Sequence, residues 1–282
     1  MRDPAGDFEA DTAVAGDAGR YRATLSDDWE LWGPAGGYVS AIALRAAGEH
    51  SRFGRPASYS CSYLGVANFG SIDIEVTTLR AAKRAEAVRV TLVQDGQPFL
   101  EAAVWAIGDD LRGLAHDVVE MPAVPGPDEL LPWMETAAPS DVRYEKFWSN
   151  VEERMIEQWF GKWRDRPVSA PIRESWCRFR PQATFDDAFL DAARSLLLID
   201  TMGWPAAMMA YTGREDYVAP TVELAARFHR PADASEWLFQ ATESPIAAGG
   251  LMGSTSRVWA EDGTLVASGG QTMLFRPGPG SP

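Results

Sequence analysis

Three polar residues in the last third of the chain are of the types that together can hold and activate a water molecule. Asp200 ends an apolar helical run, Thr221 opens a strand-like stretch, and Gln271 lies in a second such stretch. A buried carboxylate costs free energy unless it is paired or has a chemical task. A carboxylate, a hydroxyl and an amide that met in space would form a site that positions and activates a water.

The segments around these residues repeat one order of elements twice. After a strand at Tyr21–Leu25, a glycine turn leads into a predicted helix from Tyr38 to about Glu49. In the second half, strands at about 144–163 and 174–180 precede a predicted helix from Thr184 to about Gly203, where Thr184 and Asp187 have the spacing of a capping box. The strands predicted after the two helices are 58–64, 71–79, 87–92 and 99–107, and then 221–228, 236–243, 253–260 and 265–275.

The last two strands of each half are joined by the same dipeptide. Asp95-Gly96 and Asp262-Gly263 lie about 167 residues apart, and Asp-Gly between alternating strands is a strong hairpin signal. This agreement in element order indicates an ancient duplication. We therefore expect a disordered lead-in at 1–19, a first unit at 20–110, a proline-rich linker at 111–143 and a second unit at 144–282.

One helix followed by several antiparallel strands predicts an α+β fold in which a curved antiparallel sheet wraps a long central helix. The second predicted helix is apolar on nearly all sides from Ala192 to Ile199, as expected for a helix buried against such a sheet. An acid at the end of this helix, Asp200, is therefore conspicuous.

Composition argues against several classes of function. The formal net charge of −14 argues against a nucleic-acid partner, which would require clustered Lys and Arg. No apolar run approaches the roughly 18 residues that span a membrane, and the acidic start has no signal-peptide pattern, so we expect a cytoplasmic protein without a membrane partner. Cys61 and Cys177 are expected to be buried and unpaired in a reducing compartment. Three histidines without a CxxC pair suggest no metal site, and no cofactor is expected.

Both halves carry motifs of a known family. They are Gly36-Gly37-Tyr38, Leu79-Arg80 and the hairpin at 93–96 in the first half, and 228–231, 236–238 and 262–268 leading to Gln271 in the second. On these motifs the chain resembles the double-hotdog acyl-CoA thioesterases of the acyl-CoA thioesterase II (TesB-like) family, over roughly residues 20–110 and 145–276. The resemblance implies a double-hotdog fold, hydrolysis of acyl-CoA without a covalent intermediate, and a catalytic set at Asp200, Thr221 and Gln271.

Thioester hydrolysis requires an attacking water, a site for the developing oxyanion and a leaving thiolate. Asp200 would be the base or water-orienting group, with a pKa raised by burial, while Thr221 and Gln271 would hold the same water. Backbone N–H groups at Gly36 and Gly37 would receive the carbonyl oxygen of the substrate. The family often has Gln where this chain has Tyr38, so Tyr38 is expected to narrow or reshape the acyl pocket.

Two further groups of residues admit two interpretations each. His229 and Arg230 either fix the end of a strand or hold phosphates of coenzyme A. Tryptophans either pack the linker and the following strands onto the sheet or form a wall for an acyl chain; they are Trp133, Trp148, Trp159, Trp163 and Trp176. The open edges of such sheets favour a homo-oligomer.

Two other functions are compatible with this fold. A hydratase or dehydratase acting on acyl thioesters would require a histidine working with an acid near the central helix, and none of the three histidines is suitably placed. A non-catalytic acyl-CoA or lipid-binding protein would use the same groove. The presence of all three polar residues argues against such a binder, because binding alone does not require a buried Asp200.

Overall fold

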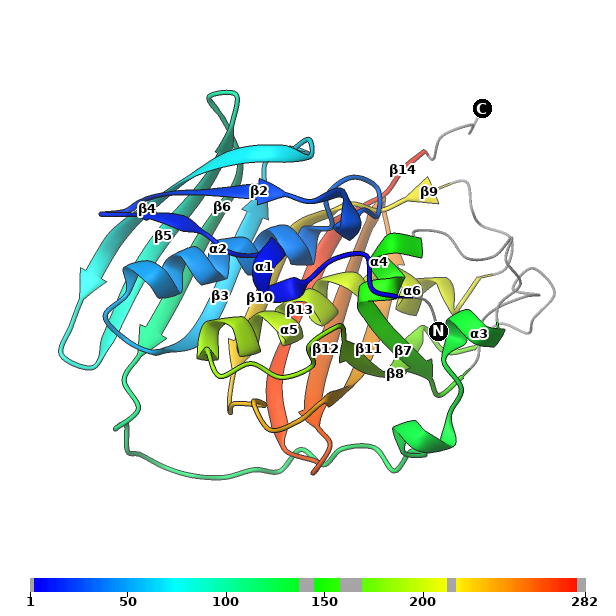
Figure 1. The fold of residues 1–282 in the computed structure, drawn as a ribbon. Coiled ribbons are helices and arrows are strands. Elements are labelled where there is room, and N and C mark those ends of the chain that lie inside the picture. Colours follow the sequence, from blue (N-terminus) through cyan, green and yellow to red (C-terminus); the bar gives the residue numbers. More distant parts are fainter. Residues whose placement is uncertain (1–2, 137–144, 158–168, 212–216, 278–282) are drawn as a thin grey trace.

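The computed structural model describes residues 3–136, 145–157, 169–211 and 217–277, and its main feature is an antiparallel sheet curved around two helices (Figure 1). The first unit contains β2 (Arg20–Leu25), α2 (Gly36–His50), β3 (Arg55–Tyr63), β4 (Gly70–Ala81), β5 (Ala85–Gln94) and β6 (Gln97–Ile107). The second contains β8 (Ile172–Phe179), α5 (Ala188–Thr201), β10 (Thr221–Phe228), β11 (Trp237–Ala248), β12 (Leu251–Ala260) and β13 (Leu265–Leu274).

Shorter elements flank and connect these units. They are α1 (Phe8–Asp11), β1 (Ala15–Asp17), the 3₁₀ helices η1 (Asp27–Trp29) and η2 (Pro127–Glu129), α3 (Trp133–Thr136), α4 (Glu145–Asn150), β7 (Val151–Met155), α6 (Gly203–Met208), β9 (Tyr217–Val218) and β14 (Arg276–Pro277). Strands β9 and β14 pair with each other apart from the main sheet.

The two units have the same topology, as the repeated order of elements in the sequence predicts. Across the described residues the main sheet runs β1-β2-β4-β5-β6-β3-β10-β13-β12-β11-β8-β7. Within each unit the helix connects the first strand to the strand at the centre of the whole sheet, β3 or β10. These two central strands pair antiparallel, with Ser60 opposite Ala225, and so join the units into one sheet.

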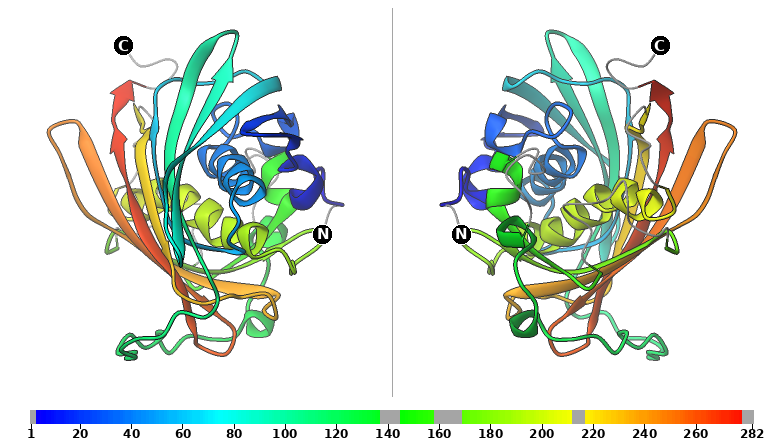
Figure 2. Two further views of the ribbon diagram at one scale, coloured as in Figure 1. Left: turned by 90° about the vertical axis from the view of Figure 1, so that its left-hand side faces the viewer. Right: turned by 90° about the vertical axis from the view of Figure 1, so that its right-hand side faces the viewer.

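Helices α2 and α5 pack against each other on the concave side of this sheet (Figure 2). They run antiparallel, because Gly37 near the start of α2 contacts Leu197 near the end of α5, whereas Gly48 contacts Phe189. The main apolar core lies around both helices, and both are buried along most of their length. The predicted fold class, a long central helix wrapped by a curved antiparallel sheet in each unit, is therefore confirmed.

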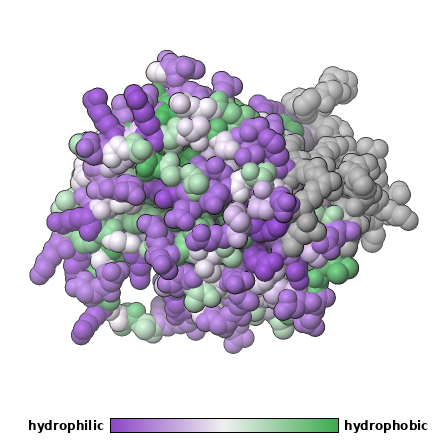
Figure 3. Space-filling view, in the orientation of Figure 1, coloured by the Kyte–Doolittle hydropathy of each residue, from purple (hydrophilic) through white to green (hydrophobic). Residues whose placement is uncertain are grey.

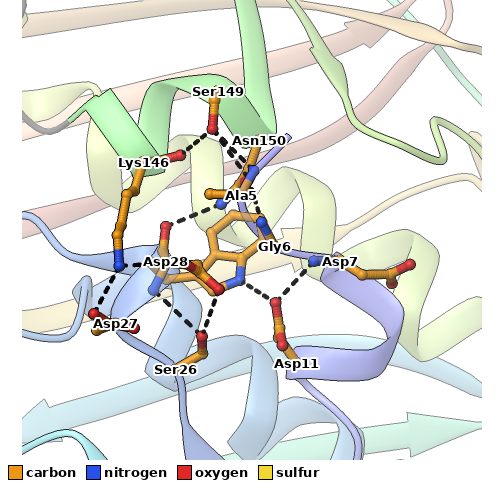
Figure 4. Close-up of polar contacts among 11 residues, drawn as sticks. Ala5, Gly6, Asp7, Asp11, Ser26, Asp27, Asp28, Lys146, Ser149 and Asn150 are labelled. Carbon is orange, nitrogen blue, oxygen red and sulfur yellow. Dashed lines mark hydrogen bonds and ion pairs between the residues drawn. The ribbon is translucent and has the colours of Figure 1, made fainter. Parts of the chain in front are cut away.

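The expectation of a disordered lead-in is wrong for the described part of residues 1–19. Phe8, in α1, is buried, and its ring packs 4.8 Å from that of Phe179 and 5.3 Å from that of Trp29. The backbone before it is held by Asn150 at the end of α4, whose Oδ1 accepts hydrogen bonds from the N–H groups of Ala5 and Gly6 (Figure 4). One buried aromatic ring and one buried amide thus fix a segment that its Pro and Gly content made appear disordered.

Two local predictions in the second unit also require correction. Residues 145–150 form helix α4 and not a strand, and only 151–155 of the predicted strand are extended as β7; the stretch 158–163 lies outside the described residues. The long helix begins at Ala188, because the cap is Asp187, whose carboxylate accepts the Leu190 N–H at 2.7 Å. Thr184 therefore lies outside the helix that it was expected to cap.

The linker covers the outer face of the second unit. Trp176, Trp237, Phe239 and Trp259 form a small apolar cluster there, packed against linker residues such as Val119 and Met121. The indole N–H of Trp176 donates to the Pro125 carbonyl, and the rings of Trp133 and Trp148 meet edge to face. These contacts support the packing interpretation of the tryptophans; Trp159 and Trp163 lie outside the described residues.

The face shown in Figure 3 is mostly hydrophilic, in keeping with a net charge of −14. Within the described ranges, no helix is long and apolar enough to cross a membrane. Cys61 and Cys177 are both buried and unpaired, as expected.

Candidate active site

The structure brings Asp200, Thr221 and Gln271 together on the inner side of the second unit. The hydroxyl oxygen of Thr221 lies 3.0 Å from Oδ1 of Asp200 and 2.8 Å from Oε1 of Gln271. The amide nitrogen of Gln271 donates to the backbone carbonyl of Asp200 at 2.8 Å. A carboxylate, a hydroxyl and an amide from three different elements thus form one hydrogen-bonded group.

Local backbone features aim these side chains at each other. Gln271 lies opposite Leu224 in the β10–β13 ladder and faces inward, as does the buried Leu224. The register of β10 shifts between Thr221 and Glu223, so Thr221 comes to lie opposite Met273. A bulge changes the side of the sheet on which the preceding residue points. This bulge places Thr221 on the inner face, beneath the last turn of α5 that carries Asp200.

The Thr221 hydroxyl has one proton and two acceptors beside it. When Asp200 is ionised, that proton can serve either the carboxylate or the Gln271 carbonyl, and the other oxygen is left with an open acceptor position. When Asp200 is protonated, its O–H can donate a hydrogen bond to the Thr221 oxygen while the Thr221 hydroxyl donates to Gln271, and the chain of hydrogen bonds is complete. The ionised form therefore favours a water molecule that donates to the group.

Burial raises the pKa of Asp200 from 3.8 to about 6. The carboxylate is nearly enclosed, which disfavours the charged form, and the hydrogen bonds from Thr221 and from the Gly37 N–H oppose this rise. A carboxylate with a pKa near 6 is largely ionised at neutral pH and is a much better proton acceptor than an exposed aspartate.

The first unit approaches the site through Gly36 and Gly37. A Cβ atom on Gly37 would lie 2.7 Å from the Cα of Leu197, so only glycine permits this contact between α2 and α5. A Cβ atom on Gly36 would lie 2.8 Å from Oδ2 of Asp200. The N–H of Gly37 is hydrogen-bonded to the Asp200 carboxylate. This N–H therefore orients the acid. A role for the N–H groups of Gly36 and Gly37 toward the substrate carbonyl oxygen stays a prediction.

Sequence reasoning missed Tyr63, the last residue of β3. Its hydroxyl lies 3.1 Å from the position that a Gly36 Cβ would occupy, so it faces Asp200 across the space that the glycine leaves. Ser40 on α2 holds the Tyr63 hydroxyl at 2.7 Å. Burial and the nearby Asp200 charge hold the pKa of Tyr63 well above its ordinary value, so the phenol keeps its proton and can donate it in a hydrogen bond.

The structure does not place Tyr38 in this site. Its side chain is fully buried, its ring stacks on Trp29, and its hydroxyl accepts from the Ser26 N–H and donates to the Asp11 carbonyl. The expectation that Tyr38 reshapes an acyl pocket is therefore wrong, because the N-terminal segment encloses this ring.

His229 and Arg230 lie beyond the other end of β10, about 26–30 Å from Thr221 at roughly 3.3 Å per residue. The His229 ring is 2.9 Å from the Ser268 hydroxyl, and Arg230 forms an ion pair with Asp117 in the linker. These contacts fix the strand end and attach the linker to it. A role for the two residues toward the phosphates of coenzyme A stays a prediction.

Comparisons with known proteins point to one family. A family model described as the acyl-CoA thioesterase C-terminal domain matches residues 118–275, and one described as the N-terminal domain of the same proteins matches residues 25–107. A search of curated protein sequences finds no match.

Similar solved structures cover nearly the whole chain. They include a hotdog-fold protein of unknown function from Alicyclobacillus acidocaldarius, with 21% identity, a TM-score of 0.80, and coverage of 96% of this chain and 98% of the other. Acyl-CoA thioesterase II TesB2 from Mycobacterium marinum has 22% identity and a TM-score of 0.78, with coverage of 97% and 100%. The tesB protein of Mycobacterium avium subs paratuberculosis has 23% identity and a TM-score of 0.75, with coverage of 96% and 98%. At these identities the likeness establishes the hotdog fold.

Proposed function

The chain belongs to the acyl-CoA thioesterase family, and from this premise we propose that it hydrolyses acyl-CoA with a water activated by Asp200, Thr221 and Gln271. One observation carries the proposal. The Thr221 hydroxyl bridges a buried carboxylate and a buried amide, and its single proton leaves one of their oxygens open to a water molecule. This arrangement has no evident structural purpose, because the carboxylate that it surrounds is unfavourable to bury.

In the proposed reaction the water gives a proton to Asp200 as its oxygen attacks the thioester carbonyl. A carbon–oxygen bond forms, and the carbonyl oxygen takes the negative charge. The electron pair on that oxygen then re-forms the carbon–oxygen double bond as the carbon–sulfur bond breaks, and the electrons of the broken bond leave with sulfur. The proton that Asp200 had taken passes to this sulfur, so coenzyme A leaves as its thiol, and the free acid is the other product. No covalent bond to the enzyme is made, and Asp200 ends in its starting state.

Tyr63 is the group that we assign to the carbonyl oxygen. If Ser40 donates to the Tyr63 oxygen, the phenolic proton is free to point toward the space beside Gly36. A fixed donor to a developing oxyanion is worth about a hundredfold or more in rate. Tyr63→Phe is therefore expected to lower kcat by about that factor with little change in KM. A loss confined to KM would exclude this role.

Thiol release from a panel of acyl-CoAs tests the proposed function directly. The panel runs from short to long, straight and aromatic acyl groups, with wild type beside Asp200→Asn. Loss of a general base lowers turnover by about 10²–10⁴-fold. The matched control is Asp73→Asn, the same substitution at an exposed acid whose ion pair with Arg22 is also exposed. It is expected to turn over as wild type does.

Two outcomes would contradict the proposal. Equal turnover by Asp200→Asn would exclude Asp200 as the base. A folded wild type that binds acyl-CoA and releases no thiol would be a binding protein instead.

The proposal extends to the setting of the enzyme. Two unpaired, buried cysteines suit a reducing cytoplasm. Among the described residues the main sheet ends in two short strands, β1 and β7, which form its edges, and such edges suit a homo-oligomer. Light scattering of the purified protein would measure the oligomeric state; a monomeric mass would exclude the oligomer.

A further inference from the structure

The inner face of the second unit carries buried polar side chains where a core would ordinarily be apolar. We call the following residues the polar patch: Ser175, Gln240, Thr242, Ser254 and Ser256, each at most 6% exposed. A hydrogen-bonded chain joins four of them. Ser256 contacts Thr242 at 2.7 Å, Thr242 donates to Gln240 at 2.8 Å, and Gln240 donates to Ser175 at 3.0 Å.

The polar patch begins directly beside the proposed catalytic residues. Ser254 lies opposite Gln271 in the β12–β13 ladder, and Cβ atoms of directly opposed residues are about 4.5–5.5 Å apart on the same face. The Ser254 hydroxyl is buried and has no hydrogen-bond partner among the described residues. An unpartnered buried hydroxyl is unfavourable in the free protein. The chain therefore keeps an unsatisfied polar group on the strand next to the one that carries Gln271.

The fold itself does not require polar residues at these positions, as the first unit demonstrates. Val104 follows the Asp95-Gly96 hairpin by eight residues, just as Gln271 follows the Asp262-Gly263 hairpin. Val104 lies opposite Val88, just as Gln271 lies opposite Ser254. In both hairpins the register of the two strands shifts at the equivalent position near the turn, after Leu92 in the first unit and after Val258 in the second.

The same alignment extends over the rest of the patch. Val90 and Val76 are opposite each other in the β4–β5 ladder, where the second unit has Ser256 and Thr242. Ile74 takes the place of Gln240. These four first-unit equivalents are all buried and apolar, and the place of Ser175 is taken by a buried tyrosine, Tyr21. One fold thus has an apolar inner face in one unit and a polar inner face in the unit that carries Asp200, Thr221 and Gln271.

An ion pair borders the polar patch without giving it a net charge. The buried carboxylate of Glu153 accepts two hydrogen bonds from the buried guanidinium of Arg173, and Arg173 lies opposite Thr242. A positive charge near the patch is therefore balanced by a negative one. A surface of hydroxyls, an amide and a balanced pair matches a neutral hydrogen-bonding group better than a carboxylate.

We propose that the acyl group of the substrate lies against the polar patch and carries a hydroxyl group, which pairs with Ser254. This inference rests on the proposed function, since it names the substrate class of that site. Because Ser254 is one strand from Gln271, the hydroxyl is close to the thioester, as in a 3-hydroxyacyl group. A substrate hydroxyl supplies the hydrogen bond that Ser254 lacks in the free protein.

Matched pairs of thioesters test the inference. Initial rates are measured for butyryl-CoA against 3-hydroxybutyryl-CoA, and for hexanoyl-CoA against 3-hydroxyhexanoyl-CoA. We expect wild type to favour each hydroxylated member in kcat/KM by about tenfold, the effect of one good hydrogen bond. Ser254→Ala is expected to bring the ratio close to one. The control is Thr255→Ala, which removes an exposed hydroxyl on the opposite face of the same strand and should keep the wild-type ratio.

A stability measurement separates this role from a structural one. Removing an unsatisfied buried hydroxyl leaves the melting temperature equal or raises it, so Ser254→Ala should be at least as stable as wild type. A clear fall in melting temperature, or a wild-type enzyme that favours the plain acyl chains, would overturn the inference. Failure of the proposed function would appear differently, as the absence of thiol release from every thioester or as full turnover by Asp200→Asn.

Discussion

The burial that raises the pKa of Asp200 also makes its carboxylate unfavourable for folding. Asp200→Asn is therefore expected to lower turnover by about 10²–10⁴-fold and to stabilise the protein at the same time. Asparagine keeps the shape of the side chain and can still pair with the Thr221 hydroxyl, but it removes the charge that burial disfavours. A gain in stability together with a loss of turnover is expected when a group is kept for function although its burial disfavours folding.

The size of the effect follows from the pKa. Between the ordinary value of 3.8 and the folded value of about 6, the folded chain holds a proton at Asp200 that the unfolded chain has released. Stability therefore falls as pH rises through this window. At about 1.4 kcal/mol for each unit of pKa, the loss is about 3 kcal/mol by neutral pH. Asp200→Asn should regain up to that amount at pH 8 and almost none of it below about pH 4.

Urea unfolding of wild type and Asp200→Asn at pH 4, 6 and 8 measures this difference. The matched control is Asp191→Asn on the same helix. Asp191 is equally buried but accepts hydrogen bonds from Arg194 and the Ala232 N–H, so its loss leaves a buried guanidinium without its carboxylate. That variant should lose about 3–5 kcal/mol. If Asp200→Asn is destabilised as well, or if its gain does not depend on pH, the account of Asp200 as a poorly solvated acid is refuted.

Three further perturbations follow from the same structure. The kcat/KM of wild type should rise with pH through about 6 and then level off, because Asp200 must be ionised to accept a proton from water; a profile from pH 4.5 to 8.5 measures this. Gly37→Ala should lower both melting temperature and turnover, because its Cβ would meet Leu197 at 2.7 Å and displace the N–H that orients Asp200. Phe8→Ala should cost about 3–5 kcal/mol of unfolding free energy in urea, as for a buried aromatic ring.

A specific result would contradict each of these three predictions. A rate that is flat from pH 5 to 8 would mean that Asp200 does not titrate in the working range. Gly37→Ala with the melting temperature of wild type would mean that α2 and α5 can separate there without loss. Phe8→Ala with unchanged stability would mean that the segment before β1 contributes nothing to the fold.

The trio could be predicted from the sequence because each member is polar in an otherwise apolar segment. Local patterns and the family resemblance both led to Asp200, Thr221 and Gln271, and the strands that carry two of them were predicted nearly to the residue. The order of helix and strands in each unit could also be predicted, because the spacing of apolar residues along a helix or strand indicates which of its faces is buried.

The residues that were missed depend on contacts between distant segments. Asn150 holds the backbone of Ala5 and Gly6 across more than 140 residues, and nothing in the composition of either segment reports this contact. Tyr63 ends an ordinary strand, and only the packing of α2 against α5 brings it opposite Asp200. For Tyr38 the sequence led to a wrong expectation. Its place in a family motif suggested that it lines the acyl pocket, whereas its hydroxyl donates to the Asp11 carbonyl in the N-terminal segment.

Both units have positions equivalent to Thr221 and Gln271, but only the second unit has polar side chains there. Both central strands have a register shift near their start, so that Pro56 lies opposite Ala106 where Thr221 lies opposite Met273. The first unit thus has proline in place of the hydroxyl, and it has Val104 in place of Gln271. Neither side chain has a polar atom that could bind a water. The buried valine instead stabilises the fold through its apolar contacts.

Under the proposed function, this asymmetry gives a reason for the two units to be joined in one chain. The second unit supplies the acid, the hydroxyl and the amide, whereas the first supplies the Gly37 N–H that orients the acid and the Tyr63 hydroxyl that faces it. A pair of identical units would have to carry both sets of residues in every copy, including the buried carboxylate and the polar inner face that weaken folding. Fusion allows one unit to keep an apolar core that stabilises the sheet while the other holds the buried polar groups of the site.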